Sequence, residues 1–176
     1  MSLLPLTQYQ IPDHAILDQF HKQTYLGNTF LFSLPPSETV GESETPLFYL
    51  LNPEGIGSPA ANNQKSIFFN LLKLTCLSTD NLYLNLYFNP TEVTGDTSTP
   101  INARTGSPFT SISTLISGPT VSGSNGTYVT SLLSGAFVQN SVCDLFILDP
   151  GKSLLVTGTG SASSTPFTAE FSWYEL

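Results

Sequence analysis

Apolar and polar residues alternate with a period of two along several stretches of this chain. In LYLNLYF (82–88), the leucines and the final phenylalanine fall on one side, and Tyr83, Asn85 and Tyr87 fall on the other. The segment FTAEFSW (167–173) repeats this pattern near the end of the chain. Because successive side chains of a strand point to opposite faces, both segments are predicted to be half-buried β-strands.

Further apolar segments have the length of strands and are bounded by turn residues. They are FLFSL (30–34), PLFYLL (46–51), SIFFNLLKLTCL (66–77), SISTLI (111–116), TYVTSLL (127–133), CDLFILD (143–149) and SLLVTG (153–158). Asp-Pro-Gly-Lys at 149–152 predicts a tight hairpin between the last two, since Pro presets φ and Gly accepts positive φ. The pattern predicts an all-β fold, an antiparallel and jelly-roll-like β-sandwich whose strand order is left open.

The first 27 residues carry no convincing strand and are predicted to form an extended or partly helical N-terminal arm. Asp13 is suited to cap a short helix over residues 13–22. The arm has apolar residues that are candidates for contact with another subunit or with a capsid: Leu3, Leu4, Leu6, Tyr9, Ile11, Ile16, Leu17 and Phe20. We therefore divide the chain into an arm, residues 1–27, and a β-sandwich domain, residues 28–176.

Length and charge limit the number of domains and the classes of partner that the chain is expected to bind. The 176 residues fit one domain. Charged residues make up only 10%, and the net charge is −8, which opposes binding to phosphate backbones and to anionic lipid. The amino terminus has no signal-peptide pattern, and no apolar run approaches the ~20 residues that span a bilayer. We expect neither nucleic acid nor a membrane as a partner.

Residues for catalysis or metal binding are sparse. The two histidines, His14 and His21, both lie in the arm, and two ligands alone make a poor metal site. No serine has an evident base beside it, so neither a catalytic residue nor a metal or other cofactor is predicted. Glu38, Glu42 and Glu44 cluster in sequence but match no calcium-loop spacing, and they are interpreted as a solvated acidic loop.

Cys76 and Cys143 both lie inside apolar stretches. Thiols in such positions usually behave as small core residues, which agrees with synthesis in a reducing compartment. Whether the two cysteines are close to each other is not readable from the sequence.

Aromatic residues near two of the predicted strands offer a contact surface. Tyr83, Tyr87 and Tyr174, together with Trp173, are candidates for a platform on which sugar rings stack. Packing within the sheet is the commoner use of such residues, and both interpretations stay open.

Five segments share their order and turn chemistry with a known group of proteins. They are TYLGNTF (24–30), LFYLLNPEGIG (47–57), IFFNLLKLTCLS (67–78), LDPGKSLLV (148–156) and FTAEFSWYE (167–175). In these segments the chain resembles small virion structural proteins of tailed bacteriophages, such as capsid decoration, cement and accessory proteins. The resemblance implies a jelly-roll or tumour-necrosis-factor-like sandwich that is commonly trimeric. Residues 58–64 depart from the group's pattern as an insertion.

The resemblance implies a non-enzymatic virion protein, most readily a capsid decoration or cement protein. Such a protein would self-assemble, with a trimer expected, and attach to the major capsid protein or another virion protein. It would be made in the host cytoplasm and would need no export. The alternative is a receptor- or carbohydrate-binding domain of a tail or fibre protein that uses residues 91–126 or the tyrosines. A hydrolase is disfavoured because no pair of base and nucleophile is evident.

Overall fold

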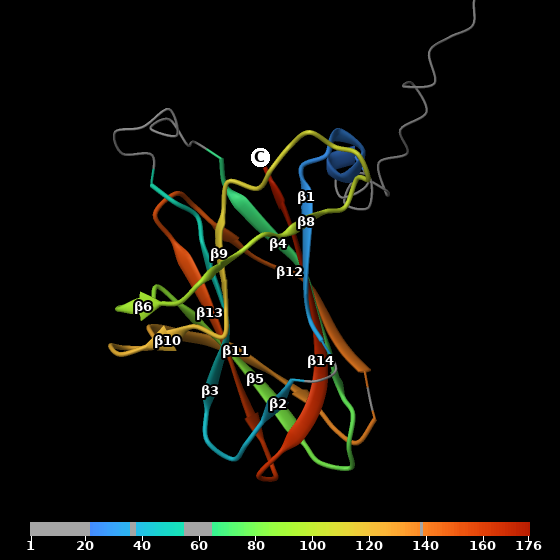
Figure 1. Cartoon of the computed structure of the whole chain (residues 1–176), viewed down its shortest axis with the longest axis vertical. Coiled ribbons are helices and arrows are strands. Elements are labelled where there is room, and N and C mark those ends of the chain that lie inside the picture. Colours follow the sequence, from blue (N-terminus) through green and yellow to red (C-terminus); the bar gives the residue numbers. More distant parts are fainter. Residues whose placement is uncertain (1–21, 36–37, 55–64, 138) are drawn as a thin grey trace, which may run out of the picture.

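The alternating segments form two antiparallel β-sheets that pack face to face, so the predicted all-β sandwich is confirmed (Figure 1). The computed structural model of the chain describes residues 22–35, 38–54, 65–137 and 139–176. We name each sheet after a central strand, the β14 sheet and the β13 sheet.

The β14 sheet has the strand order β12-β4-β14-β1-β8, with β2 paired to β14. Its strands are β1 (Thr29–Leu34), β2 (Thr39–Val40), β4 (Ile67–Cys76), β8 (Ile101–Asn102), β12 (Gln139–Leu148) and β14 (Thr165–Glu175). The β13 sheet has the order β11-β5-β13-β3-β9-β7. Its strands are β3 (Thr45–Leu51), β5 (Leu82–Phe88), β7 (Thr97–Ser98), β9 (Thr114–Ser117), β11 (Thr127–Ser134) and β13 (Ser153–Gly160). A separate pair is formed by β6 (Val93–Thr94) and β10 (Thr120–Val121).

The longest strands of the described residues are connected as a jelly roll. In chain order these are β1, β3, β4, β5, β11, β12, β13 and β14. Numbered first to eighth, they are arranged 6-3-8-1 in one sheet and 5-4-7-2 in the other. The chain therefore passes back and forth between the sheets, which is the double Greek key of a jelly roll.

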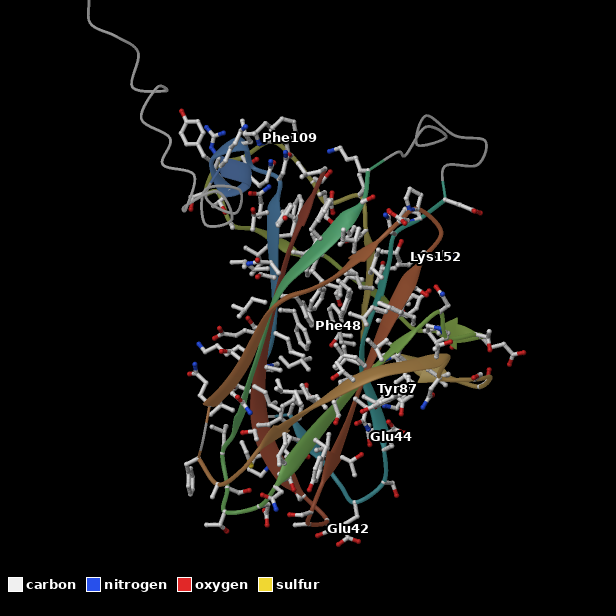
Figure 2. The ribbon with its side chains drawn as sticks, turned by 180° about the vertical axis from the view of Figure 1, so that it is seen from behind. Glu42, Glu44, Phe48, Tyr87, Phe109 and Lys152 are labelled. Carbon is white, nitrogen blue, oxygen red and sulfur yellow. The ribbon has the colours of Figure 1, made fainter. Side chains whose placement is uncertain are left out.

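The hydrophobic core lies between the two sheets. Phe167, Ala169, Phe171 and Trp173 of β14 all point into it, as the alternation along this segment predicts. Phe48 of β3 stacks on Phe171 across the gap, with ring centroids 4.4 Å apart and an interplanar angle of 2°. Figure 2 shows Phe48 at the centre of the molecule. Removing a core aromatic of this kind typically costs about 3–5 kcal/mol, so this stack is a major link between the sheets.

The Asp149–Lys152 turn forms, but the predicted hairpin is wrong. Gly151 has a φ of +79°, and the Lys152 N–H donates to the Asp149 carbonyl at 3.0 Å. The strand before the turn, β12, pairs with β4, whereas the strand after it, β13, pairs with β3 and β5. The turn therefore carries the chain from one sheet to the other.

Strand boundaries differ from the prediction where polar residues form part of a strand. β12 begins at Gln139, four residues before the predicted start at 143, and its first three residues are exposed and polar. These residues pair with β4 at the edge of the β14 sheet, where no apolar pattern is needed. Residues 91–126, expected to be irregular apart from one strand, contain the five short strands β6 to β10.

The amino-terminal part of the described chain begins with a short helix at residues 22–26, and β1 follows from Thr29. The Asn28 side-chain amide donates to Gln23 Oε1 at 2.9 Å, which ties the helix to the start of the sandwich. The predicted helix over 13–22, except its last residue, lies outside the described residues. So do all eight apolar contact candidates of the arm, from Leu3 to Phe20.

The two cysteines are too far apart for a disulfide. Cys76 is a free thiol, fully buried in the core. Cys143 pairs in backbone register with Leu71, five residues before Cys76 on β4. Five residues of strand span about 17 Å, well beyond the Cα separation of about 7 Å that a disulfide tolerates.

Candidate functional site

The alternation along β5 places three polar or aromatic side chains on the outer face of the β13 sheet. These are Tyr83, Asn85 and Tyr87. Tyr128 of β11 lies opposite Tyr87 in the register, and their rings meet edge to face with centroids 5.7 Å apart. Glu44, just before β3, completes the group. We call the surface formed by these five residues the tyrosine face.

The Glu44 carboxylate is fixed by three donors. Its Oε1 accepts hydrogen bonds from the Asn85 side-chain amide at 2.9 Å and from the Tyr87 hydroxyl at 2.8 Å. A short hydrogen bond from the buried Thr157 hydroxyl reaches the same oxygen. Figure 2 shows Glu44 and Tyr87 side by side, away from the core around Phe48. Glu42 and Glu44 are both exposed, as expected for a solvated acidic loop, whereas Glu38 is half-buried. Nothing in the sequence indicates that Glu44 is also held by three donors.

The electrostatics of the pair favour charged Glu44 and neutral Tyr87. Partial burial raises the pKa of Glu44, but the bonds from Thr157, Asn85 and Tyr87 outweigh it, so the net pKa is below the ordinary 4.5. Burial, together with the bond to Glu44 and its charge, raises the pKa of Tyr87 to about 12. At neutral pH the site therefore presents an ionised acceptor beside a protonated hydroxyl, and Tyr87 is unsuited to act as a base.

The predicted aromatic platform is only partly assembled. Tyr83 and Tyr87 share the tyrosine face, but Tyr174 lies on the β14 sheet, where it stacks on Phe68 with centroids 4.9 Å apart. Trp173 is fully buried in the core and is not part of a surface. The structure adds Tyr128, which the sequence does not single out because a register shift between Tyr128 and Thr130 disturbs the alternation of β11.

The outer face of the β14 sheet is apolar near the end that carries Tyr174. Several partly or largely exposed apolar side chains gather there. We call this surface the apolar face, and it consists of Leu31, Phe68, Leu71, Ile101, Ile147 and Tyr174. A groove of about 210 Å³ is lined by Phe68, Ile147 and Tyr174, among others.

A second carboxylate, Glu175, is buried at the end of β14 with a residue exposure of 1%. It accepts a short hydrogen bond from the Ser111 hydroxyl and further bonds from the Ile112 N–H at 3.0 Å and the Trp173 indole N–H at 3.4 Å. Burial raises the pKa of Glu175, although the three bonds and the charge of Lys65 oppose the shift. Sixty-four residues separate Ser111 from Glu175. Sequence spacing therefore gives no signal for this contact.

A pocket of about 340 Å³ lies beside this buried carboxylate. Its lining is rich in hydroxyl groups, among them Thr97, Ser111 and Ser113, and includes the exposed ring of Phe109. The Ser113 and Ser111 hydroxyls are 2.5 Å apart. Because Glu175 already accepts bonds at both of its oxygens, we assign it to holding residues 111–113 against β14 rather than to chemistry in the pocket.

No group of three His, Cys, Asp or Glu side chains in the described part of the chain is placed to hold a metal ion. His14 and His21 lie outside that part. Within the described ranges, no helix has the length and apolar character needed to cross a membrane.

No family model matches the chain, and no curated protein matches it either. The tyrosine face and the apolar face are the two surfaces of the described residues that bear most directly on function.

Proposed function

We propose that this protein is a non-enzymatic assembly protein whose jelly roll associates with further copies of itself through the apolar face. The observation that supports this most directly is the exposure of large aliphatic side chains there. Ile101 is 68% exposed and Ile147 is 54% exposed. Contiguous exposed apolar surface of this kind usually marks an interface.

The strand register makes the apolar face continuous. Ile147 pairs with Phe68, which pairs with Tyr174, so the three form one row across β12, β4 and β14. In the next row, Leu71 pairs with Ser172 of β14, and Ser172 pairs with Leu31 of β1. Ile101 of β8 pairs with Leu31 and extends that row to the sheet edge. The two rows are two residues apart along β14 and therefore lie side by side.

Charge favours a second copy as the partner on this face. A net charge of −8 makes copies repel one another over most of their surface. Among the described side chains on the outer face of the β14 sheet, the charged ones are Lys73 and Glu170, which form an ion pair at 3.1 Å. Two copies meeting over this face therefore bring together no unpaired like charges from the described residues.

The finer proposal is a capsid decoration or cement protein of a tailed bacteriophage, with a trimer as the expected state. It is supported by the resemblance in five segments and by the place where residues 22–27, the described end of the arm, lie on the sandwich. The helix at 22–26 lies beside β8, because Asn102 donates to the Gly27 carbonyl at 2.7 Å and Arg104 lies over the Tyr25 ring. The 21 residues before it can span at most about 70 Å, enough to reach a neighbouring subunit or the major capsid protein.

Sedimentation velocity tests the assembly proposal. The wild-type protein is expected to be a stable oligomer, and Ile101→Glu and Ile147→Glu are expected to shift it to monomer while the circular dichroism spectrum is kept. Leu133→Glu is the matched control, because Leu133 is 46% exposed but lies on β11 of the other sheet. A wild-type monomer, or oligomers that tolerate both substitutions on the apolar face, would contradict the proposal.

The capsid proposal has its own test. Removal of residues 2–21 is expected to leave the sandwich folded but to weaken co-sedimentation with capsids built from the major capsid protein of the same phage. If the deletion leaves co-sedimentation unchanged, the proposed role of the arm in capsid attachment is refuted. If the full chain does not co-sediment with capsids, the decoration proposal is refuted, whereas the self-assembly proposal is unaffected.

A further inference from the structure

A second function is suggested by the tyrosine face, which lies on the sheet opposite to the apolar face. Its chemistry differs: phenol rings, an amide and a carboxylate are grouped there, with the exposed aliphatic side chain of Leu133 opposite Tyr83 at one end. The rings lie on β5 and on the edge strand β11, where Tyr128 is 55% exposed. Such rings offer apolar surface for stacking together with polar groups at their edges.

The polar groups are held ready for a ligand. Glu44 Oε1 is occupied by three donors, which fix the plane of the carboxylate, while no hydrogen bond from the described residues reaches Oε2. The pKa of Glu44 is lowered, so Oε2 is a charged acceptor at neutral pH. An acceptor fixed in advance costs less ordering when a ligand hydroxyl binds to it.

The length of the tyrosine face suits an extended ligand. Tyr83, Asn85 and Tyr87 follow one another on the same side of β5, so the two rings are separated by about 13 Å with an amide between them. Beneath this row, Leu155 of β13 is fully buried although it points away from the core, and its register neighbours are Tyr87 and Tyr49. The Tyr87 end of the tyrosine face therefore packs against a buried aliphatic side chain.

The charge of the residues around the tyrosine face indicates which class of ligand it can bind. None of the five Lys and Arg residues lies on β5, β11 or β13. Glu42 and Glu44 give the nearby surface negative charge, which repels sulfated, phosphorylated or sialylated sugars. A neutral ligand with many hydroxyl groups and ring faces for stacking is the chemistry that fits.

From these observations we infer that the tyrosine face binds a neutral linear oligosaccharide. Tyr128 and Tyr87 stack on sugar rings, Glu44 Oε2 accepts hydrogen bonds from ring hydroxyls, and Asn85 orients the carboxylate. This site does not depend on the assembly proposal, because the two surfaces lie on different sheets.

Isothermal titration calorimetry is the test, with a panel of linear neutral glucans, mannans and galactans and with sialylated and sulfated sugars for comparison. At least one neutral sugar is expected to bind, and Tyr128→Ala is expected to weaken its binding by about tenfold, which corresponds to a loss of about 1.4 kcal/mol from the stacked ring. Glu44→Gln is expected to weaken it by about fivefold, as the loss of a charge-assisted hydrogen bond implies. Tyr25→Ala is the control, because Tyr25 is exposed but lies on the helix at 22–26, and it should bind as wild type does.

Several outcomes would overturn the inference. These are binding to no neutral sugar of the panel, tighter binding to sialylated or sulfated sugars, or Tyr128→Ala binding as tightly as wild type. The Ile101→Glu variant separates the two proposals. If sugar binding persists in that variant, the sugar site is independent of assembly. If binding is lost together with the oligomer, the claim that the sugar site does not depend on assembly is refuted.

Discussion

Two carboxylates in this jelly roll, Glu44 and Glu175, receive almost the same kind of support, yet their pKa values move in opposite directions. Each accepts hydrogen bonds from three donors, and in each case at least one donor is a hydroxyl group. The pKa of Glu44 is lowered, whereas the pKa of Glu175 is raised.

The difference between the two sites is their access to water. Glu44 is on the surface of the tyrosine face, so its donors outweigh the cost of removing it from solvent. Glu175 is closed off at the end of β14, where burial outweighs the same number of donors. With the same number of donors, Glu44 is thus a charged acceptor that a ligand can reach. Glu175 instead joins residues 111–113 to β14, and its ionisation is opposed by burial. This is why we assign ligand binding to the Glu44 region and fold stability to the Glu175 region.

The largest effect is expected from Glu175→Ala. This change leaves the Ile112 N–H and the Trp173 indole N–H without their acceptor and frees residues 111–113 from β14, so the free energy of unfolding should fall by about 3 kcal/mol. Urea denaturation followed by tryptophan fluorescence measures it. Glu175→Gln, which keeps the volume and one acceptor oxygen, is the control and should cost about 1 kcal/mol. Equal losses in the two variants would contradict a role for the hydrogen bonds.

The pH dependence of stability should separate Glu175 further. Because its pKa is raised on folding, the folded state holds a proton that the unfolded state has released between pH 4.5 and the raised value. The stability of wild type relative to Glu175→Gln should therefore be greatest below pH 4.5 and fall as pH rises through that window. Denaturation of both proteins across the acid range measures the difference. A relative stability that increases with pH would show that the donors, rather than burial, decide the sign.

Residues that reveal their role through local pattern could be predicted from the sequence. The alternation in 82–88 and 167–173 gave the correct faces of β5 and β14, and Tyr83 and Tyr87 do share a surface. The period of two is a local property, so it is readable from neighbouring residues. The sandwich itself follows from many such segments.

What could not be predicted depends on contacts between distant segments. Tyr128 joins Tyr87 through strand pairing across a register shift, and Thr157 reaches Glu44 from 113 residues away. The Asp149–Lys152 turn has the expected backbone, but which sheets its strands join is decided by pairing with β4 on one side and with β3 and β5 on the other. Spacing in the sequence carries no information about such partners.

A smaller effect is expected from Glu44→Gln. The pKa of Glu44 is lowered on folding, so its contribution to stability is present above pH 4.5 and is lost as pH falls through the lowered value. The sign is thus opposite to that of Glu175. Since the group is exposed to solvent, the difference from wild type at neutral pH should stay below about 1 kcal/mol. Thermal denaturation at neutral and acid pH measures it, and a loss as large as that of Glu175→Ala would overturn the contrast between the two sites.

The smallest effect concerns a proton rather than stability. If the Glu44 charge helps to hold the Tyr87 proton, then Glu44→Gln should lower the pKa of Tyr87 from about 12 towards the ordinary value of 10, with little change in the free energy of unfolding. Alkaline difference spectroscopy of the tyrosines, with Tyr87→Phe to assign the signal, measures the shift. Burial contributes to the raised pKa as well, so the value should remain above 10 in Glu44→Gln. A Tyr87 that titrates identically with and without the Glu44 charge would show that the hydrogen bond does not persist in solution, and the carboxylate would then not be held ready for a ligand.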